Sequence, residues 1–466
     1  MTLSPWASAA EIARAVGAKE IAAAAVTEAA LATIARRNPT LNAFTDVTAA
    51  RARTQAAKVD SALAAGAAPG PLAGVPFAVK NLFDVAGLPT RAGSLINRER
   101  APATADATLI ARLEAAGAVL LGALNMGEYA YDFTGENVHD GASRNPHDLS
   151  RMTGGSSGGS GGAVAGGLVP LALGSDTNGS IRVPAAFCGL FGLKPTYGRL
   201  SRAGSFPFVA GLDHLGPLAR STADLALAYD AMQGFDPADP VCRDRPAEPT
   251  LAGLRRGATG LRVAVLGGYF ARGAVPQALE AVRACAEALG ASDIVEIPEA
   301  ARARAAAFVI TASEGAALHL DRLRARPEDF DPAVRDRLLA GALIPAAYVA
   351  RAQKFRRWYA AELKKLFERF DVLLAPATPI AAPRLGQQTF LLDGIEVPLR
   401  PNIGIYTQPI SFVGLPVVAV PVATPEKLPL AVQVIAAPWR EDFSLRVAAA
   451  LEQAGVAHAP RPHLED

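Results

Sequence analysis

Three residues, Lys80, Ser156 and Ser180, are of types that together can perform nucleophilic catalysis. Ser156 lies in the run Gly-Gly-Ser-Ser-Gly, and Ser180 follows it by 24 residues in Asp-Thr-Asn-Gly-Ser-Ile-Arg-Val-Pro. Lys80 ends the apolar run Val-Pro-Phe-Ala-Val-Lys, so its amine would emerge inside the core. Burial can lower the pKa of a lysine by about 3–5 units, and a neutral lysine is a competent general base. The pattern therefore favours acyl transfer to a serine over a lysine that only extends its amine from a strand end into solvent.

The glycine-rich stretch around Ser156 has four other interpretations, which its residues argue against. A flexible linker would not continue into the apolar run Leu168 to Gly174, which predicts a buried strand. A P-loop needs a lysine after its glycines, and a dinucleotide-binding turn needs a G-x-G-x-x-G spacing, and neither is present. A nucleophile elbow at Ser156 needs an apolar strand before the serine and a histidine partner, whereas loop-forming residues precede it. None of the six histidines lies in a catalytic motif: His139, His147, His214, His319, His458 and His463.

Composition excludes several classes of protein. The chain has 466 residues and a net charge of +2, so nothing favours capture of nucleic acid or of an anionic membrane. Cys188, Cys242 and Cys285 are too few and too widely spaced for a disulfide framework or a metal cluster. The N-terminus lacks the pattern of a signal peptide. A helix that spans a bilayer needs about 20 apolar residues, and no apolar run in the sequence is that long. We expect a cytoplasmic protein.

The elements that must position these residues follow from the hydrophobic pattern. The first sixty or so residues have helical periodicity, with a helix expected to end at Asn38-Pro39. From Pro71 onward, apolar strand-like runs alternate with amphipathic helical runs, which predicts an α/β protein with a largely buried sheet. The run Ala-Ala-Phe-Cys-Gly-Leu-Phe-Gly around Cys188 predicts a packed helix and a core cysteine. Two more apolar runs and a helix close the chain.

The chain resembles the amidase signature hydrolases from about residue 8 to residue 455. The resemblance rests on the block from Gly154 to Pro184 with its two spaced serines, on Val-Lys-Asn-Leu-Phe-Asp at the lysine, and on Gly-Leu-Phe-Gly-Leu-Lys-Pro-Thr-Tyr-Gly-Arg. It implies one domain over residues 1–466 with the fold of that family: a mixed, largely buried β-sheet covered by helices on both faces in three α/β/α layers. Within that domain we expect four regions: an N-terminal helical segment (1–65), a catalytic core (66–230), a helical substrate-side region (240–400), and C-terminal strands and a helix that complete the sheet (401–466).

The resemblance also implies roles for individual residues. Ser180 would be the acylated nucleophile and Lys80 the base. Ser156, held by a cis peptide bond, would pass the proton between them. The backbone amides of four consecutive residues would form the oxyanion hole: Thr177, Asn178, Gly179 and Ser180. Asp176 and Arg182 would support the loop, and His139 and His147 would be structural. No metal and no organic cofactor is implied.

Asn178 departs from the family pattern, in which most members carry glycine. A polar side chain at the rim of the oxyanion hole favours a small, nitrogen-rich acyl group of the ureide or biuret type. A carboxylated substrate would need a cation, for which Arg144, Arg151 and Arg202 are equal candidates. The resemblance further implies a small helical companion protein, and a higher oligomer is compatible with it. A glutaminase subunit of a tRNA-dependent amidotransferase, a general small-amide amidase and a non-catalytic binding module stay open as alternatives.

Overall fold

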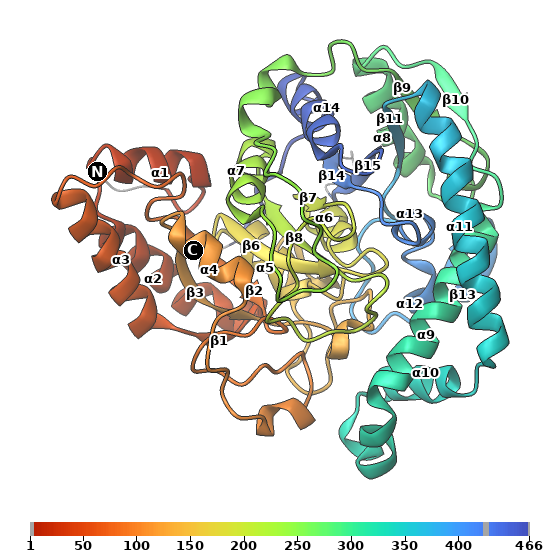
Figure 1. The fold of residues 1–466 in the computed structure, drawn as a ribbon, viewed down its shortest axis with the longest axis horizontal. Helices are drawn as coiled ribbons and strands as arrows, with labels where there is room; N and C mark the ends of the chain where they lie inside the picture. Colours follow the sequence, from red (N-terminus) through yellow and green to blue (C-terminus); the bar gives the residue numbers. More distant parts are fainter. Residues whose placement is uncertain (1–3, 423–427, 465–466) are drawn as a thin grey trace.

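The computed structural model describes residues 4–422 and 428–464. Its main feature is an eleven-stranded mixed sheet, with neighbouring strands in the order β1-β3-β2-β6-β8-β7-β14-β15-β11-β9-β10 (Figure 1). In chain order these strands are β1 (Phe44–Val47), β2 (Pro76–Lys80), β3 (Val119–Leu124), β6 (Leu171–Asp176), β7 (Phe191–Lys194), β8 (His214–Ala219), β9 (Val263–Leu266), β10 (Asp293–Val295), β11 (Val372–Pro376), β14 (Val417–Val422) and β15 (Leu430–Ala436). Two hairpins lie outside it: β4 (Arg144–Asn145) with β5 (Asp148–Met152), and β12 (Thr389–Leu392) with β13 (Ile395–Pro398).

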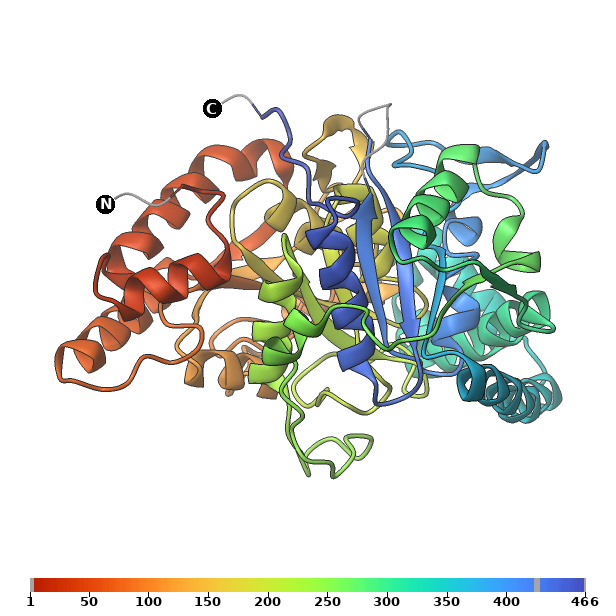
Figure 2. The same cartoon turned by 90° about the horizontal axis from the view of Figure 1, so that it is seen from above.

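Helices cover both faces of the sheet (Figures 1 and 2). On one face α7 packs against α14, and on the other α5 packs against α6. Helices α1 to α3 lie at one end of the molecule, and α9 to α11 lie at the other. The helices are α1 (Ala9–Gly17), α2 (Ala23–Leu41), α3 (Ala49–Ala64), α4 (Thr108–Ala115), α5 (Gly158–Ala165), α6 (Arg182–Cys188), α7 (Thr222–Met232), α8 (Pro276–Ala288), α9 (Ala300–Ala325), α10 (Pro332–Ala342), α11 (Ala346–Arg369), α12 (Leu399–Asn402), α13 (Gln408–Ser411) and α14 (Glu441–Gln453).

The predicted α/β class and the covered mixed sheet are confirmed. The central strands are continuous apolar runs, and β2, β3, β6, β14 and β15 are buried along their whole length. Such runs form strands that are covered on both faces, because neither side of the strand meets water. Cys188 is buried at the end of α6, as expected, and burial raises the pKa of its thiol. Among the described residues, no helix is long and apolar enough to cross a membrane.

Two expectations for the N-terminal residues were wrong in detail. Helix α2 passes Pro39 and ends at Leu41, where Asn42 adopts a left-handed φ of 49°. The Asn42 amide then donates to the Asn38 carbonyl, and the Asn38 side chain accepts from the amides of Ala43 and Phe44. The helical pattern is also interrupted by β1, which pairs with β3 at the edge of the sheet. Pairing with the free edge of β3 thus stabilises a strand here, although the local sequence pattern favours a helix.

The glycine-serine stretch is a packed helix and not a tether. All eight residues of α5 are buried. A Cβ atom on Gly159 would lie 2.5 Å from backbone atoms of Ala43 and Asn125, and one on Gly158 would lie 2.7 Å from Thr153 Oγ1. Larger side chains are excluded there because real Cβ atoms do not approach so closely. The glycines thus let α5 lie against the backbone of its neighbours, directly behind the loop that carries Ser156.

Candidate active site

Strands β2 and β6 bring Lys80 to the site. They are parallel neighbours, with Val79 opposite Leu173, so their carboxyl ends lie at the same edge of the sheet. Lys80 ends β2 and is fully buried. Its Nζ donates to Ser156 Oγ at 2.6 Å and to Ser175 Oγ at 2.8 Å. Sequence reasoning missed Ser175, although a serine one residue before the end of a parallel neighbour strand could have been expected at this edge.

Burial sets the protonation state of Lys80. It lowers the pKa of the amine from its ordinary 10.5 to about 7, against the opposing effect of the carboxylates of Asp213, Asp176 and Asp132. A lysine with that pKa is neutral in a large fraction of molecules near neutral pH. The amine can therefore accept a proton from a hydroxyl group within hydrogen-bond distance, and that of Ser156 is one.

Ser156 lies in the loop between β5 and α5, and its peptide bond with Gly155 is cis. The loop is fixed by backbone contacts: the Gly155 amide donates to the Phe133 carbonyl, and the Gly127 amide donates to the Ser156 carbonyl. Gly155 has no room for a side chain, because a Cβ atom would lie 2.4 Å from Asp132 Oδ2. Lys80 and Ser156, which come from distant parts of the sequence, are thus brought together as predicted.

Ser180 follows β6 in a tight loop that ends at α6. Gly179 has a φ of 146°, and a Cβ atom there would lie 2.3 Å from Thr407 Oγ1. The same Thr407 hydroxyl donates to the Asn178 carbonyl at 2.6 Å, which fixes the direction of the loop. The amides of Thr177, Asn178, Gly179 and Ser180 donate to no other described residue. Four consecutive amides without partners are suited to stabilise an oxyanion.

Asp176 and Arg182 tie the two ends of this loop together. Arg182 donates to both Asp176 oxygens at 2.9 Å, and both side chains are fully buried. Asp176 also accepts from the Ile181 amide, while Arg182 donates to Gln433 Oε1 at 2.7 Å on β15. Burial raises the pKa of Asp176, but the charge and hydrogen bonds of Arg182 outweigh burial and hold that pKa well below its usual range. This geometry agrees with the supporting role expected for the pair.

Ser180 lines a narrow pocket of about 20 Å³, which is the space of one or two waters. Its other lining residues include Thr177, Asn178, Phe308, Arg337 and Arg400. A larger cavity of about 280 Å³ shares Ala130, Thr177 and Phe208 with the pocket and reaches Ser175 and Asp213. Bulky side chains of the pocket must therefore move before a substrate larger than a few atoms can reach Ser180.

Two side chains of this pocket have unused polar groups. The Asn178 Nδ2 donates to Thr311 Oγ1 on α9 at 2.9 Å, whereas the buried Asn178 Oδ1 has no partner among the described residues. Arg337 comes from α10, and its guanidinium lies 3.9 Å from the centre of the Tyr131 ring. No described carboxylate forms an ion pair with Arg337, whereas Arg400 is paired with Asp132 and Glu136. Arg337 Nε and Nη2 donate to the carbonyls of Ala333 and Tyr131, so Nη1 is the part of this guanidinium that is still available to an anionic ligand.

The three arginines proposed from the sequence as carboxylate anchors are not in this pocket. Arg144 donates to the Leu149 carbonyl on the exposed β4–β5 hairpin, and Arg151 is paired with Asp148. Arg202 lines only the larger cavity and is paired with Asp239. A signal for Arg337 was present in the sequence. Buried residues of α10 recur as Val334, Leu338 and Gly341, and Arg337 interrupts that apolar face.

The histidines contribute to the surrounding structure. His139 contacts the buried Glu128 carboxylate at 3.1 Å, and His147 contacts the Cys188 carbonyl at 3.1 Å. His214 contacts two backbone carbonyls. No histidine lines the pocket that holds Ser180. Within the described ranges, no group of three or more His, Cys, Asp or Glu side chains could hold a metal ion.

A profile of the amidase family matches residues 25–445, which is most of the chain. The protein belongs to the amidase family. It is an amide hydrolase, and the predicted family is confirmed. The chain is 55% identical to the AtzE subunit of 1-carboxybiuret hydrolase from Pseudomonas sp. (strain ADP), over 96% of this chain and 98% of the relative.

Two further comparisons place this amidase among its relatives. It is 40% identical to a subunit of the glutamyl-tRNA(Gln) amidotransferase of Azotobacter vinelandii, over 97% of this chain and 98% of the relative. A solved structure, described as a vestigial protein complex that reveals the evolutionary origins of an s-triazine catabolic enzyme, superimposes with a TM-score of 0.97. That chain is 54% identical and is covered completely, with 97% of this chain aligned.

Proposed function

We propose that this amidase hydrolyses the terminal amide of 1-carboxybiuret to give 1,3-dicarboxyurea and ammonia, a step of cyanuric acid degradation. The observation that carries the proposal is the pocket that Ser180 lines together with Asn178, whose side-chain oxygen has no described partner, and Arg337, which has no carboxylate partner. High identity to the 1-carboxybiuret hydrolase subunit supports the same substrate. The proposed enzyme is cytoplasmic and uses no metal or organic cofactor.

The reaction proceeds in two halves. Neutral Lys80 takes a proton from Ser156, which takes one from Ser180 as the Ser180 Oγ attacks the carbonyl carbon of the terminal amide. The amides of residues 177–180 stabilise the resulting oxyanion, and one such donor contributes about 2.7–4 kcal/mol. The carbon–nitrogen bond breaks as the relay returns a proton to the nitrogen, and ammonia leaves. Water, activated by the same relay, then attacks the acyl-serine, releases the carboxylate product and restores Ser180.

Recognition of the substrate uses the two unused polar groups. The Arg337 Nη1 group binds the carboxylate of 1-carboxybiuret through a charge-assisted hydrogen bond, since Nε and Nη2 already donate to the carbonyls of Ala333 and Tyr131. The Asn178 Oδ1 accepts from a substrate N–H, which satisfies a buried acceptor that otherwise costs about 1–3 kcal/mol. Both contacts favour a small substrate that is rich in N–H groups and carries a carboxylate.

A small helical companion protein completes the proposed enzyme. The related s-triazine enzyme forms a protein complex, which supports a heteromeric assembly here. We expect the chain expressed alone to be less soluble or less active than the chain expressed with its companion. Size-exclusion chromatography and specific activity of both preparations test this, and full activity of a monodisperse isolated chain would contradict it.

The substrate is tested by measuring ammonia release from 1-carboxybiuret, biuret and glutamine in parallel, with the Ser180→Ala variant as the blank. The proposal predicts the highest kcat/KM for 1-carboxybiuret and none for the variant. Turnover of glutamine alone would identify a glutaminase instead. Equal turnover of all three would identify a general small-amide amidase, and no ammonia from any of them would favour a binding protein.

A further inference from the structure

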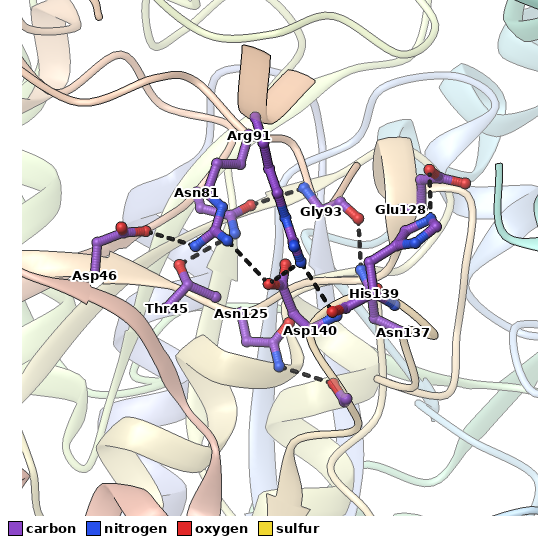
Figure 3. A network of polar contacts seen from close by, with 12 residues as sticks. Thr45, Asp46, Asn81, Arg91, Gly93, Asn125, Glu128, Asn137, His139 and Asp140 are labelled. Atoms are coloured by element: carbon purple, nitrogen blue, oxygen red, sulfur yellow. Dashed lines mark hydrogen bonds and ion pairs between the residues drawn. The ribbon is translucent and has the colours of Figure 1, made fainter. Parts of the chain in front are cut away.

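Glu128 is a fully buried carboxylate with no part in the chemistry described above. It lies in the short 3-10 helix η2 (Glu128–Ala130), four residues after β3. One oxygen contacts His139 Nε2 at 3.1 Å (Figure 3), and the other accepts from the Asp331 amide at 2.7 Å. Burial raises the pKa of Glu128, and the hydrogen bond from His139 opposes that effect. A buried carboxylate loses its hydration, so it is retained only where hydrogen bonds or nearby charges compensate for that loss.

The contact with Asp331 places the Glu128 carboxylate at the start of α10. Asp331 is the N-cap of that helix, and its side chain accepts from the Ala333 amide. An acceptor at this end of a helix satisfies an amide that has no partner in the helix and interacts favourably with the helix dipole. Helix α10 carries Arg337 six residues after Asp331, between one and two turns further along. A shift of the Glu128 carboxylate would therefore move the start of α10 and, with it, Arg337.

The residues that follow Glu128 contact α10 a second time, at Arg337 itself. Tyr129 and Ala130 both have left-handed φ angles, of 49° and 61°, which non-glycine residues adopt only where their surroundings enforce it. This turn brings the Tyr131 ring to 3.9 Å from the Arg337 guanidinium, and the Tyr131 carbonyl accepts from Arg337 Nη2. One short segment thus holds both the start of α10 and the guanidinium that the helix presents.

His139 holds the Glu128 carboxylate by the oxygen that does not contact Asp331. The His139 amide donates to Asn137 Oδ1 at 2.7 Å. Asn137 Nδ2 donates to the Gly93 carbonyl (Figure 3) and to the Met126 carbonyl. The imidazole is therefore anchored to the chain just after β3. Hydrogen bonds and contacts thus connect the segment after β3, through Asn137, His139 and Glu128, to the start of α10.

We propose that Glu128, held by His139, is a positioning residue that sets where the Arg337 guanidinium meets the substrate carboxylate. The inference rests on the proposed function, in which Arg337 binds that carboxylate. Glu128 is then a determinant of substrate specificity, although it does not contact the substrate. Its removal weakens binding of carboxylated amides and leaves the acyl-transfer chemistry at Ser180 in place.

The test compares KM and kcat for 1-carboxybiuret and for biuret, which lacks the carboxylate. Glu128→Ala raises KM for 1-carboxybiuret about tenfold, the effect of one lost charge-assisted hydrogen bond, with kcat and the biuret parameters within about threefold. Glu128→Gln keeps an oxygen that can accept from the Asp331 amide and so retains most of the affinity. Glu99→Ala is the matched control: its exposed carboxylate pairs with Arg326 close to the same helix, and its loss leaves both substrates unchanged.

A double-mutant cycle separates this inference from the proposed function. Arg337→Ala alone raises KM for 1-carboxybiuret, and adding Glu128→Ala raises it no further, because the two residues act through one contact with the substrate. Additive increases of KM in the double variant, or equal increases for both substrates from Glu128→Ala, overturn the positioning role of Glu128. Arg337 would in that case still be the residue that binds the substrate carboxylate. If Arg337→Ala affects both substrates equally, the anchor itself is wrong, and this inference falls with it.

Discussion

Replacing Lys80 by methionine should abolish turnover and at the same time stabilise the protein at neutral and acidic pH. The unfolded chain binds the Lys80 proton with its ordinary pKa of 10.5, and the folded chain binds it with a pKa of about 7. The unfolded state therefore binds more protons between these values, so burial of the lysine costs free energy that is fully present below pH 7 and absent above pH 10.5. At 1.36 kcal/mol per pKa unit, that cost is about 5 kcal/mol.

Methionine has a similar length and no charge, so it removes this cost. It also removes the hydrogen bonds to Ser156 and Ser175, which together contribute about 2 kcal/mol. The expected net gain is about 3 kcal/mol at pH 6, falling as pH rises and reversing in sign near pH 9. Urea denaturation at pH 6, 8 and 10 measures it, with Lys58→Met at an exposed position of α3 as the control. A variant less stable than the native chain at pH 6, or a difference that does not change with pH, would show that burial of Lys80 does not cost this free energy.

Three further predictions follow from the same geometry. The kcat/KM for 1-carboxybiuret rises with pH to a plateau with an apparent pKa near 7, because Lys80 acts when neutral; a profile that is flat from pH 5 to 9 contradicts this. Asn178→Gly keeps measurable hydrolysis but lowers the preference for biuret-type over simple aliphatic amides about tenfold, since the Oδ1 acceptor is lost; an unchanged preference shows that Asn178 does not contact the substrate. Asp176→Asn leaves Arg182 buried without its counter-charge and lowers the free energy of unfolding by about 3–5 kcal/mol in denaturant titrations; a loss below 1 kcal/mol excludes a supporting role.

Much of the candidate site could be predicted because its signals are local. Lys80 ends an apolar run, and Ser156 and Ser180 lie among glycines whose backbones have no room for side chains. Each of these constraints acts at a single position, so it can be recognised from the residue type at that position. The strands that deliver Lys80 and Ser175 were equally predictable, because buried parallel strands appear as continuous apolar runs.

Arg337 was missed because its position depends on contacts that are distant in sequence. It reaches the pocket only because α10 packs beside the turn at Tyr129 and Ala130, about 200 residues earlier. The three arginines that the sequence offered as candidates lie outside this pocket: Arg144, Arg151 and Arg202. Arg151 and Arg202 are also already paired with carboxylates. Strand β1 was missed for a similar reason, since its pairing with β3 overrides a local helical pattern.

The proposed mechanism requires that the acyl group of the substrate is transferred to Ser180. Rapid quenching of the enzyme with 1-carboxybiuret, followed by digestion and mass spectrometry, tests it most directly. We expect a transient acyl adduct on the peptide that contains Ser180, absent in Ser180→Ala and nearly absent in Lys80→Met. An adduct on Ser156, or steady turnover by Ser180→Ala, would contradict it.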